Sequence, residues 1–174
     1  MARITVVGLG PGDFGLLTLA AWEAMQAASP LRLCTAIHPT AEELLRRGVA
    51  FTSYDARYET AADFDSLYAD IAADLLALSQ GAENLVYAVP GSPFVAERTV
   101  GLLRQGADAA GVALFFLPGM SFVELFCHRL GLDPIDGLTV VDAGDIARLP
   151  SPLFTGCIVA QVYSPAVASE VKLS

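Results

Sequence analysis

The chain has 174 residues and a mass of 18.3 kDa, enough for one main hydrophobic core but not for two full-sized domains. Apolar residues make up 54% of the sequence and charged residues only 17%, which excludes intrinsic disorder. The net charge of −9 has the wrong sign for binding the phosphates of a nucleic acid. No apolar run approaches the ~20 residues of a membrane helix, and no basic amphipathic stretch suits an anionic membrane surface.

The N-terminal segment and the cysteines indicate the compartment. Residues 1–8 carry one positive charge and reach a glycine too early for the apolar region of a signal peptide, so we expect a cytoplasmic protein. Cys34, Cys127 and Cys157 form no Cys-x-x-Cys pair, which argues against a disulfide framework or a structural zinc site. We interpret all three as reduced thiols in the core and expect no metal.

Short runs of β-branched and aromatic residues predict strands along the whole chain. Most runs are continuously apolar, as is typical of buried parallel strands. The predicted strands are residues 4–7, 31–35, 51–54, 85–89, 113–117, 138–142 and 158–163. Helical patterns cover residues 16–27, 40–47, 61–79, 93–110 and 121–130. The alternation predicts an α/β fold with an open, mainly parallel sheet and helices on both faces.

Two helix starts and one domain boundary follow from local signals. Ser92 before Pro93 predicts an N-cap with a first-position proline, and Ser121 with Glu124 predicts a capping box. We expect an N-terminal α/β domain over residues 1–119. Residues 120–174 then form an incomplete second α/β domain, because the last helical pattern carries no stop signal and suggests a longer natural protein.

Three predicted strands end in glycine-containing corners, which we define as corner one (residues 8–13), corner two (89–93) and corner three (117–121). The carboxyl ends of parallel strands share one edge of the sheet, and ligands of open α/β folds bind there. Glycines allow backbone groups to approach a ligand closely. We therefore expect a ligand crevice at this edge.

Corner one matches neither of the glycine-rich loops that bind phosphate. Asp13 stands where the dinucleotide fingerprint requires glycine, and no acidic residue follows the second strand at residues 35–38. A Gly-Lys-Ser/Thr sequence is also absent. Asp13 instead suits a helix cap, and its carboxylate would repel a pyrophosphate. These facts disfavour a nucleotide-binding oxidoreductase and permit a ligand without phosphate, such as S-adenosylmethionine, without selecting it.

The three corners are accompanied by His38-Pro39 after the second strand and by the run from Tyr87 to Val100. In the order of these motifs, the chain resembles the tetrapyrrole (corrin/porphyrin) methylase superfamily over essentially its whole length. Residues 89–93, 161–163 and 168–172 are more narrowly similar to the methylase-like domain in front of a MazG-type nucleotide pyrophosphohydrolase. The resemblance implies a homodimer that binds S-adenosylmethionine between two domains. By position it implies cofactor contacts from Leu9, Pro11, Gly91, Ser92, Val95, Ser121, Phe122 and Val162, and it assigns no catalytic residue.

The resemblance implies an S-adenosylmethionine-dependent methyltransferase domain acting on a small molecule. The alternative is a non-catalytic ligand-binding or regulatory module attached to a MazG-type pyrophosphohydrolase. Tetrapyrrole methylases usually have Gly-Asp-Pro at positions 91–93 and an arginine- and glycine-rich stretch at 94–98, and this chain departs from both, so a tetrapyrrole is not the expected acceptor. Because the family's second domain extends beyond residue 174, this chain is expected to bind the cofactor weakly.

Other polar residues have plainer interpretations. His38 precedes a proline and is expected in an exposed loop, and neither it nor His128 has a partner histidine at metal-binding spacing. Residues 54–59 are rich in tyrosine and acid and are expected to form a surface loop, with a substrate lip as the alternative. Trp22 has helical spacing and is expected in the core.

Overall fold

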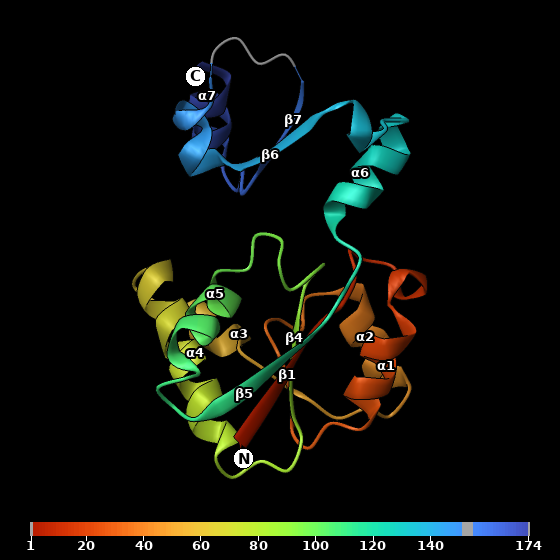
Figure 1. Ribbon diagram of the computed structural model, residues 1–174, viewed down its shortest axis with the longest axis vertical. Helices are drawn as coiled ribbons and strands as arrows, with labels where there is room; N and C mark the ends of the chain where they lie inside the picture. The colour runs from red at the N-terminus through yellow and green to blue at the C-terminus, as the bar shows by residue number, and fades with distance from the viewer. Residues whose placement is uncertain (1, 151–154, 174) are drawn as a thin grey trace. The chain divides into compact units, whose positions relative to one another are not determined.

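The computed structural model describes residues 2–150 and 155–173 (Figure 1). The chain divides into two compact units, Met1–Phe122 and Val123–Ser174. This division falls three residues beyond the boundary predicted from the sequence. The interpretation of the second unit as an incomplete domain remains a prediction.

The first unit contains a five-stranded parallel sheet with the order β3-β2-β4-β1-β5. Its strands are β1 Ala2–Gly8, β2 Leu31–Leu33, β3 Thr52–Ser53, β4 Leu85–Val89 and β5 Val112–Leu117. Every residue of β4 is buried, which explains its continuously apolar sequence. The predicted parallel α/β fold is confirmed.

Helices cover both faces of this sheet, with α4 and α5 on one side and α1 and α2 on the other (Figure 1). Ile71, Leu75 and Leu103 fill the core under α4 and α5, whereas Met25 and Leu44 fill the core under α1 and α2. The helical elements are η1 Phe14–Leu16, α1 Leu19–Gln26, α2 Pro39–Arg46, α3 Asp55–Thr60, α4 Phe64–Ser79 and α5 Arg98–Gly106.

The segment after β4 corrects one predicted helix start. Helix α5 begins at Arg98, so the expected start at Pro93 is wrong and Ser92 is not its N-cap. The Val95 N–H donates to the Ser92 carbonyl oxygen at 3.1 Å, which closes a turn around Pro93. Proline favours the second position of a turn as well as the first turn of a helix, and the local sequence does not separate the two.

The tyrosine-rich segment after β3 is helical, which corrects the expected surface loop. Residues 55–60 form α3, and the preceding Tyr54 is only 5% exposed. The Tyr54 hydroxyl donates to Asp74 at 2.7 Å, and the Asp55 carboxylate accepts from the Thr35 hydroxyl and from the Ala36 N–H. Burial of the Tyr54 ring and its bond to Asp74 raise the pKa of this phenol well above its usual value.

The second unit pairs β6 with β7 in parallel. Its elements are α6 Phe122–Leu130, which starts at the unit boundary, η2 Pro134–Asp136, β6 Leu138–Asp142, η3 Ala143–Arg148, β7 Gly156–Ala160 and α7 Pro165–Leu173. The predicted helix over residues 121–130 is confirmed within one residue, and its capping box remains a prediction. Cys34 and Cys127 are buried as expected, but Cys157 is exposed, so the interpretation of all three as core thiols is wrong for Cys157.

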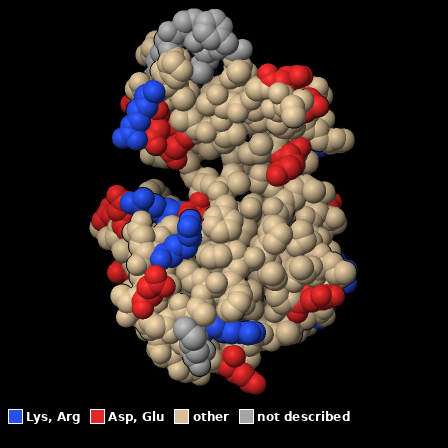
Figure 2. Space-filling view, in the orientation of Figure 1, with Lys and Arg blue, Asp and Glu red and all other residues tan. Residues whose placement is uncertain are grey.

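Charged side chains are sparse on the surface seen in Figure 2. Acidic and basic groups form small separate clusters there, with wide uncharged areas between them. Among the described helices, none combines the length and the apolar content needed to cross a bilayer.

Candidate functional site

The sheet order brings corners one, two and three to neighbouring strands, because β1 lies between β4 and β5. The Leu9 N–H donates to the Val89 carbonyl oxygen at 2.7 Å. Gly10 and Gly91 exchange two backbone hydrogen bonds, of 3.2 Å from the Gly10 N–H and 2.9 Å from the Gly91 N–H. The corners lie at the carboxyl edge of the sheet, as the sequence predicted, and corners one and two are also bonded to each other there.

Two of the corner glycines are required by packing within the protein. A Cβ atom on Gly8 would lie 2.2 Å from the Gly91 carbonyl oxygen, and one on Gly119 would lie 2.6 Å from the same oxygen. Gly8 and Gly119 thus let the three corners meet backbone to backbone. Gly91 differs, because its φ is +62° and a Cβ there would only make an ordinary contact with the Ser121 Cα at 3.8 Å. Gly91 is therefore favoured by its backbone conformation rather than by close packing.

The first turn of α2 holds the backbone of corner one. His38 is the N-cap of α2, and its Nδ1 accepts from the Thr40 N–H at 3.2 Å, so its Nε2 carries the proton and donates to the Gly10 carbonyl oxygen at 3.1 Å. The fully buried Thr40 hydroxyl donates to the Leu9 carbonyl oxygen at 2.9 Å and lies 3.3 Å from that of Gly12. We call His38 and Thr40 the α2 latch.

The α2 latch corrects the expectation for His38. This histidine is half-buried and bonded at both ring nitrogens, rather than exposed in a loop. Burial lowers its pKa, and the bond to the Gly10 carbonyl opposes that shift only in part, so the neutral ring is favoured. Sequence reasoning missed the role of Thr40 altogether, although its position directly after His38-Pro39 was the available signal.

Two further caps fix the segment after corner one. The Asp13 carboxylate accepts from the Gly15 N–H at 2.7 Å and caps η1, which confirms its predicted structural role. Thr18 caps α1 by accepting from the Ala21 N–H at 3.3 Å. The Thr18 hydroxyl also lies 3.3 Å from the Pro118 carbonyl oxygen, so α1 is tied to corner three.

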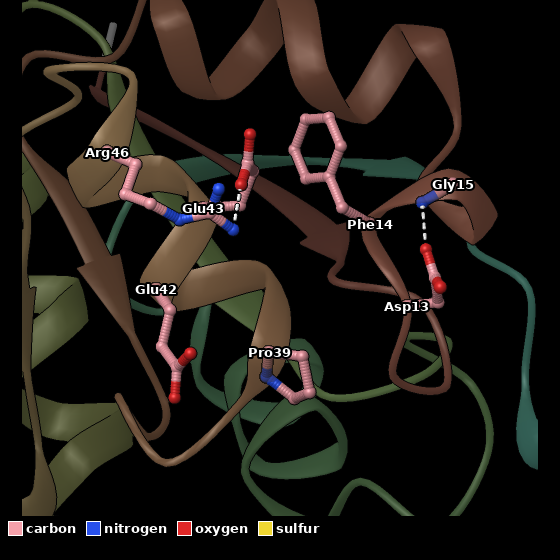
Figure 3. A pocket seen from close by; sticks show the side chains of 7 residues that line it. All are labelled: Asp13, Phe14, Gly15, Pro39, Glu42, Glu43 and Arg46. Carbon is pink, nitrogen blue, oxygen red and sulfur yellow. Dashed lines mark hydrogen bonds and ion pairs between the residues drawn. The ribbon is translucent and has the colours of Figure 1, made fainter.

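A surface pocket of about 400 Å³ lies beside corner one (Figure 3). It is lined by Asp13, Phe14, Gly15, Pro39, Glu42, Glu43 and Arg46. Arg46 forms an ion pair with Glu43, as Figure 3 shows, and Glu43 also accepts from Arg47 at 2.6 Å. Three carboxylates around the opening disfavour an anionic ligand. None of the residues proposed from the sequence to contact a cofactor lines this pocket.

The proposed cofactor-binding residues differ in how much a ligand could reach them. Leu9 is fully buried and both its backbone groups are bonded inside the protein, whereas Ser121 is 2% exposed. Partly exposed positions at the corner edge are Pro11, Gly91, Ser92, Val95 and Phe122. Val162 belongs to the second unit and is exposed there. The assignment of these residues to a cofactor remains a prediction.

The structure also assembles a polar cluster that sequence reasoning did not find. The Cys34 Sγ lies 3.2 Å from the Tyr58 hydroxyl, and the fully buried Tyr87 hydroxyl has no hydrogen-bond partner among the described residues apart from the weakly bonding Cys34 thiol. Burial raises the pKa of Glu97 to about 8. Burial, and then the nearby Glu97 charge, raise the pKa of Cys34 to about 11, so this thiol stays neutral and is a poor nucleophile. The departure from the family pattern at residues 94–98 was the available signal.

Comparison with known sequences identifies the family. The profile of the Tetrapyrrole (Corrin/Porphyrin) Methylases matches residues 3–171. The uncharacterized protein YabN of Bacillus subtilis (strain 168) is 40% identical over 172 residues, which are 99% of this chain and 35% of YabN. A siroheme synthase of Baumannia cicadellinicola subsp. Homalodisca coagulata is 31% identical over 123 residues, or 70% of this chain and 25% of that protein. The chain thus spans about a third or less of the length of these relatives.

Solved structures share the fold. Uroporphyrin-III-C-methyltransferase from Thermus thermophilus superposes with a TM-score of 0.68 at 21% identity, covering 91% of this chain and 67% of that one. A diphthine synthase superposes with a TM-score of 0.62 at 21% identity, covering 82% of this chain and 55% of that one. Uroporphyrin-III C-methyltransferase from Thermus thermophilus in complex with S-adenosylhomocysteine superposes with a TM-score of 0.57 at 22% identity, covering 81% of this chain and 55% of that one. The joined corners and the profile match over nearly the full length agree, and the chain belongs to the tetrapyrrole (corrin/porphyrin) methylase family.

Proposed function

We propose that this chain is an S-adenosylmethionine-dependent methyltransferase domain that acts on a small-molecule nucleophile. The observation that carries the proposal is the paired hydrogen bonding of Gly10 with Gly91, which joins two of the corners at the edge where ligands of open α/β folds bind. Membership of the methylase family and the fold shared with a methyltransferase bound to S-adenosylhomocysteine support it.

The residues at this edge fit a cofactor without phosphate. Asp13 keeps an exposed carboxylate in corner one, which disfavours a pyrophosphate, whereas Gly91, Ser92 and Val95 are partly exposed at or just after corner two. These three residues would hold the cofactor. When bound, it supplies an activated methyl group, and the remaining task of the protein is to align the acceptor and exclude water. The α2 latch would keep corner one in a fixed shape during that alignment.

A second candidate function is a ligand-binding module without turnover, attached to a MazG-type pyrophosphohydrolase. The match to YabN favours it, because the chain covers 35% of that protein and leaves most of it for other domains. Under either function we propose that the acceptor or ligand is not a tetrapyrrole, since Glu97 stands within the stretch that is arginine- and glycine-rich in tetrapyrrole methylases.

Binding and transfer measurements separate these functions. Calorimetric titration with S-adenosylhomocysteine tests the cofactor site, and Val95→Asp should abolish binding, because an unpaired carboxylate would face the cofactor. Ala109→Asp, at an exposed turn after α5, is the matched control. Incubation of labelled S-adenosylmethionine with the chain and a cell extract then tests turnover. Binding without any labelled acceptor would favour the module, and no binding by the wild-type chain would refute the cofactor assignment.

We also propose a homodimer. Apolar side chains exposed on the first unit include Phe94 at 59% and Phe115 at 52%, and Phe115 lies on the edge strand β5. An obligate interface would bury more than about 2,000 Å². Light scattering should give twice the mass of 18.3 kDa at micromolar concentration, and the single-chain mass would refute the proposal.

A further inference from the structure

The loop after β4 ends in an acid whose side chain has no hydrogen-bond or ion-pair partner among the described residues. Glu97 directly precedes α5, and its side chain makes no capping hydrogen bond. Among the described residues no ion pair reaches it, since the neighbouring Arg98 is 63% exposed and lies 3.9 Å from Asp65. A partly buried carboxyl group without a counter-charge is unusual, because acids taken out of water are normally paired.

Glu97 lies close enough to a group of tyrosines for its charge to act on them. We define the acid–phenol cluster as Glu97, Cys34, Tyr58, Tyr68 and Tyr87. The charge of Glu97 acts on each of the other four members. The rings of Tyr58 and Tyr68 meet edge to face at 6.4 Å.

The acid–phenol cluster has an open side and a closed side. Glu97, Tyr58 and Tyr68 are each partly exposed, which gives a ligand an approach. Tyr87 is fully buried in β4, and its hydroxyl has no hydrogen-bond partner among the described residues, apart from the nearby Cys34 thiol, which is a weak donor and acceptor. Buried hydroxyls are normally bonded to a strong partner, so this oxygen still has the capacity to accept a hydrogen bond.

The cluster lacks a positive charge of its own. The nearby Arg57 is bonded to Asp74 at 2.7 Å, and Arg104 stacks on the Phe94 ring at 5.7 Å. The other charged groups that act on the cluster, Asp55 and Asp65, are also acids. The missing partner is therefore a cation that also donates hydrogen bonds.

We propose that the acid–phenol cluster binds a protonated amine. An ammonium group carries three N–H donors, of which one can reach the Glu97 carboxylate and another the Tyr87 hydroxyl oxygen. Aromatic faces such as those of Tyr58 and Tyr68 attract cations. The inference rests on the proposed function, because the ammonium belongs either to the amino-acid part of the cofactor or to the acceptor.

Binding of an amine is coupled to a proton. Without a ligand, Glu97 is protonated at pH 7, because burial raises its pKa to about 8. A bound ammonium favours the carboxylate, so close to one proton leaves for each ligand bound at pH 7. Affinity should rise by up to about tenfold per pH unit between pH 6 and pH 8. The Cys34 thiol and the phenols of the cluster do not titrate in this range, since their pKa values are all raised.

Calorimetry in two buffers of different ionisation enthalpy measures that proton directly. The first titration uses S-adenosylhomocysteine, and the second adds 1,4-diaminobutane to the chain saturated with it, with neutral 1,4-butanediol for comparison. Glu97→Gln should weaken the amine-dependent binding step at least tenfold at pH 7 and abolish proton release. The exposed Glu83→Gln should change neither. If Glu97→Gln loses affinity and proton release in the first titration, the ammonium belongs to the cofactor. If it loses them in the second titration, the ammonium belongs to the acceptor.

The outcomes separate this inference from the proposed function. If S-adenosylhomocysteine does not bind the wild-type chain, the cofactor assignment fails whatever Glu97 does. If it binds and neither titration releases a proton that Glu97→Gln removes, the amine site is refuted and the cofactor assignment stands. A Glu97→Gln variant that binds both probes with the affinity of the wild type would also refute the amine site.

Discussion

The Thr40 hydroxyl and the Leu9 carbonyl oxygen are joined by a buried hydrogen bond of 2.9 Å, which ties the first turn of α2 to the loop after β1. Both groups lie out of reach of water, because each residue is fully buried. The bond therefore fixes the shape of corner one from within the protein core. Together with the bond from His38 to Gly10, it makes the loop shape depend on α2.

Thr40→Val should weaken both the fold and the cofactor site. The variant keeps the side-chain shape and leaves the Leu9 carbonyl unbonded, which costs about 1–3 kcal/mol of stability. Thr40→Ser keeps the hydroxyl and loses one methyl group, worth about 1 kcal/mol. Urea unfolding measures the stability of both variants, and titration with S-adenosylhomocysteine measures affinity. Affinity should fall in Thr40→Val and persist in Thr40→Ser; equal affinity in both would mean that the latch does not shape the site.

His38 should make the first unit sensitive to acid. Its pKa is lowered in the folded state, so below the usual value of 6.5 the unfolded chain takes up a proton that the folded chain resists. The stability that the neutral His38 ring contributes is therefore fully present above pH 6.5 and is lost as the pH falls below that value. Protonation at Nδ1 would also remove the acceptor for the Thr40 N–H and place a positive charge at the N-terminus of α2.

His38→Asn tests this dependence, because asparagine is a good N-cap that does not titrate in this range. Melting temperatures between pH 7.5 and pH 5 should fall less steeply in the variant than in the wild type. His128→Asn changes an exposed histidine of α6 and serves as the control. Identical pH profiles for the wild type and His38→Asn would contradict the proposed titration.

The sheet was predictable because its strands carry their signal locally. Leu85–Val89 is apolar at every position, and a run of this kind fits only a strand buried on both faces. The convergence of the corners followed from the parallel order. By contrast, Ser92-Pro93 fits a turn and a helix start equally well, and only the tertiary structure decides between them.

The site was less predictable, because its important contacts join residues distant in sequence. The Thr40 bond spans 31 positions, and the cluster around Glu97 draws on five separate segments. No local pattern shows that, in the part of the chain that the structure describes, Tyr87 has only the weak Cys34 thiol as a partner and Glu97 has no counter-charge. Both facts depend on which side chains the fold leaves nearby.

Gly8→Ala should destabilise the first unit strongly. The added Cβ would lie 2.2 Å from the Gly91 carbonyl oxygen, so the backbone of corner two must move, at a cost of about 3 kcal/mol or more. Gly101→Ala lies in α5 with no atom within 4 Å of the new Cβ and should stabilise by up to about 1 kcal/mol. Urea unfolding measures both variants, and a Gly8→Ala variant as stable as the wild type would show that the corners are not close-packed.

Glu97→Gln should stabilise the chain at neutral and alkaline pH while weakening its binding of amines. The folded-state pKa of Glu97 is raised to about 8 from the usual 4.5, so between these values the unfolded chain loses a proton that the folded chain keeps. Glu97 therefore does not lower the free energy of unfolding below pH 4.5. As the pH rises towards 8, it lowers that free energy by up to a few kcal/mol. Glutamine, which is close in shape and uncharged, removes that cost.

Urea unfolding at pH 4.5, 6 and 8 should show a gap between Glu97→Gln and the wild type that widens with pH, whereas Glu83→Gln should follow the wild type throughout. Equal stability at every pH would mean that water already solvates the Glu97 carboxylate, and the basis for an amine site would be lost. A residue that lowers stability when its site is empty is expected where function requires a charge, because stabilising replacements are otherwise readily available. The gain in stability and the loss of proton-linked amine binding should therefore occur together in the same variant.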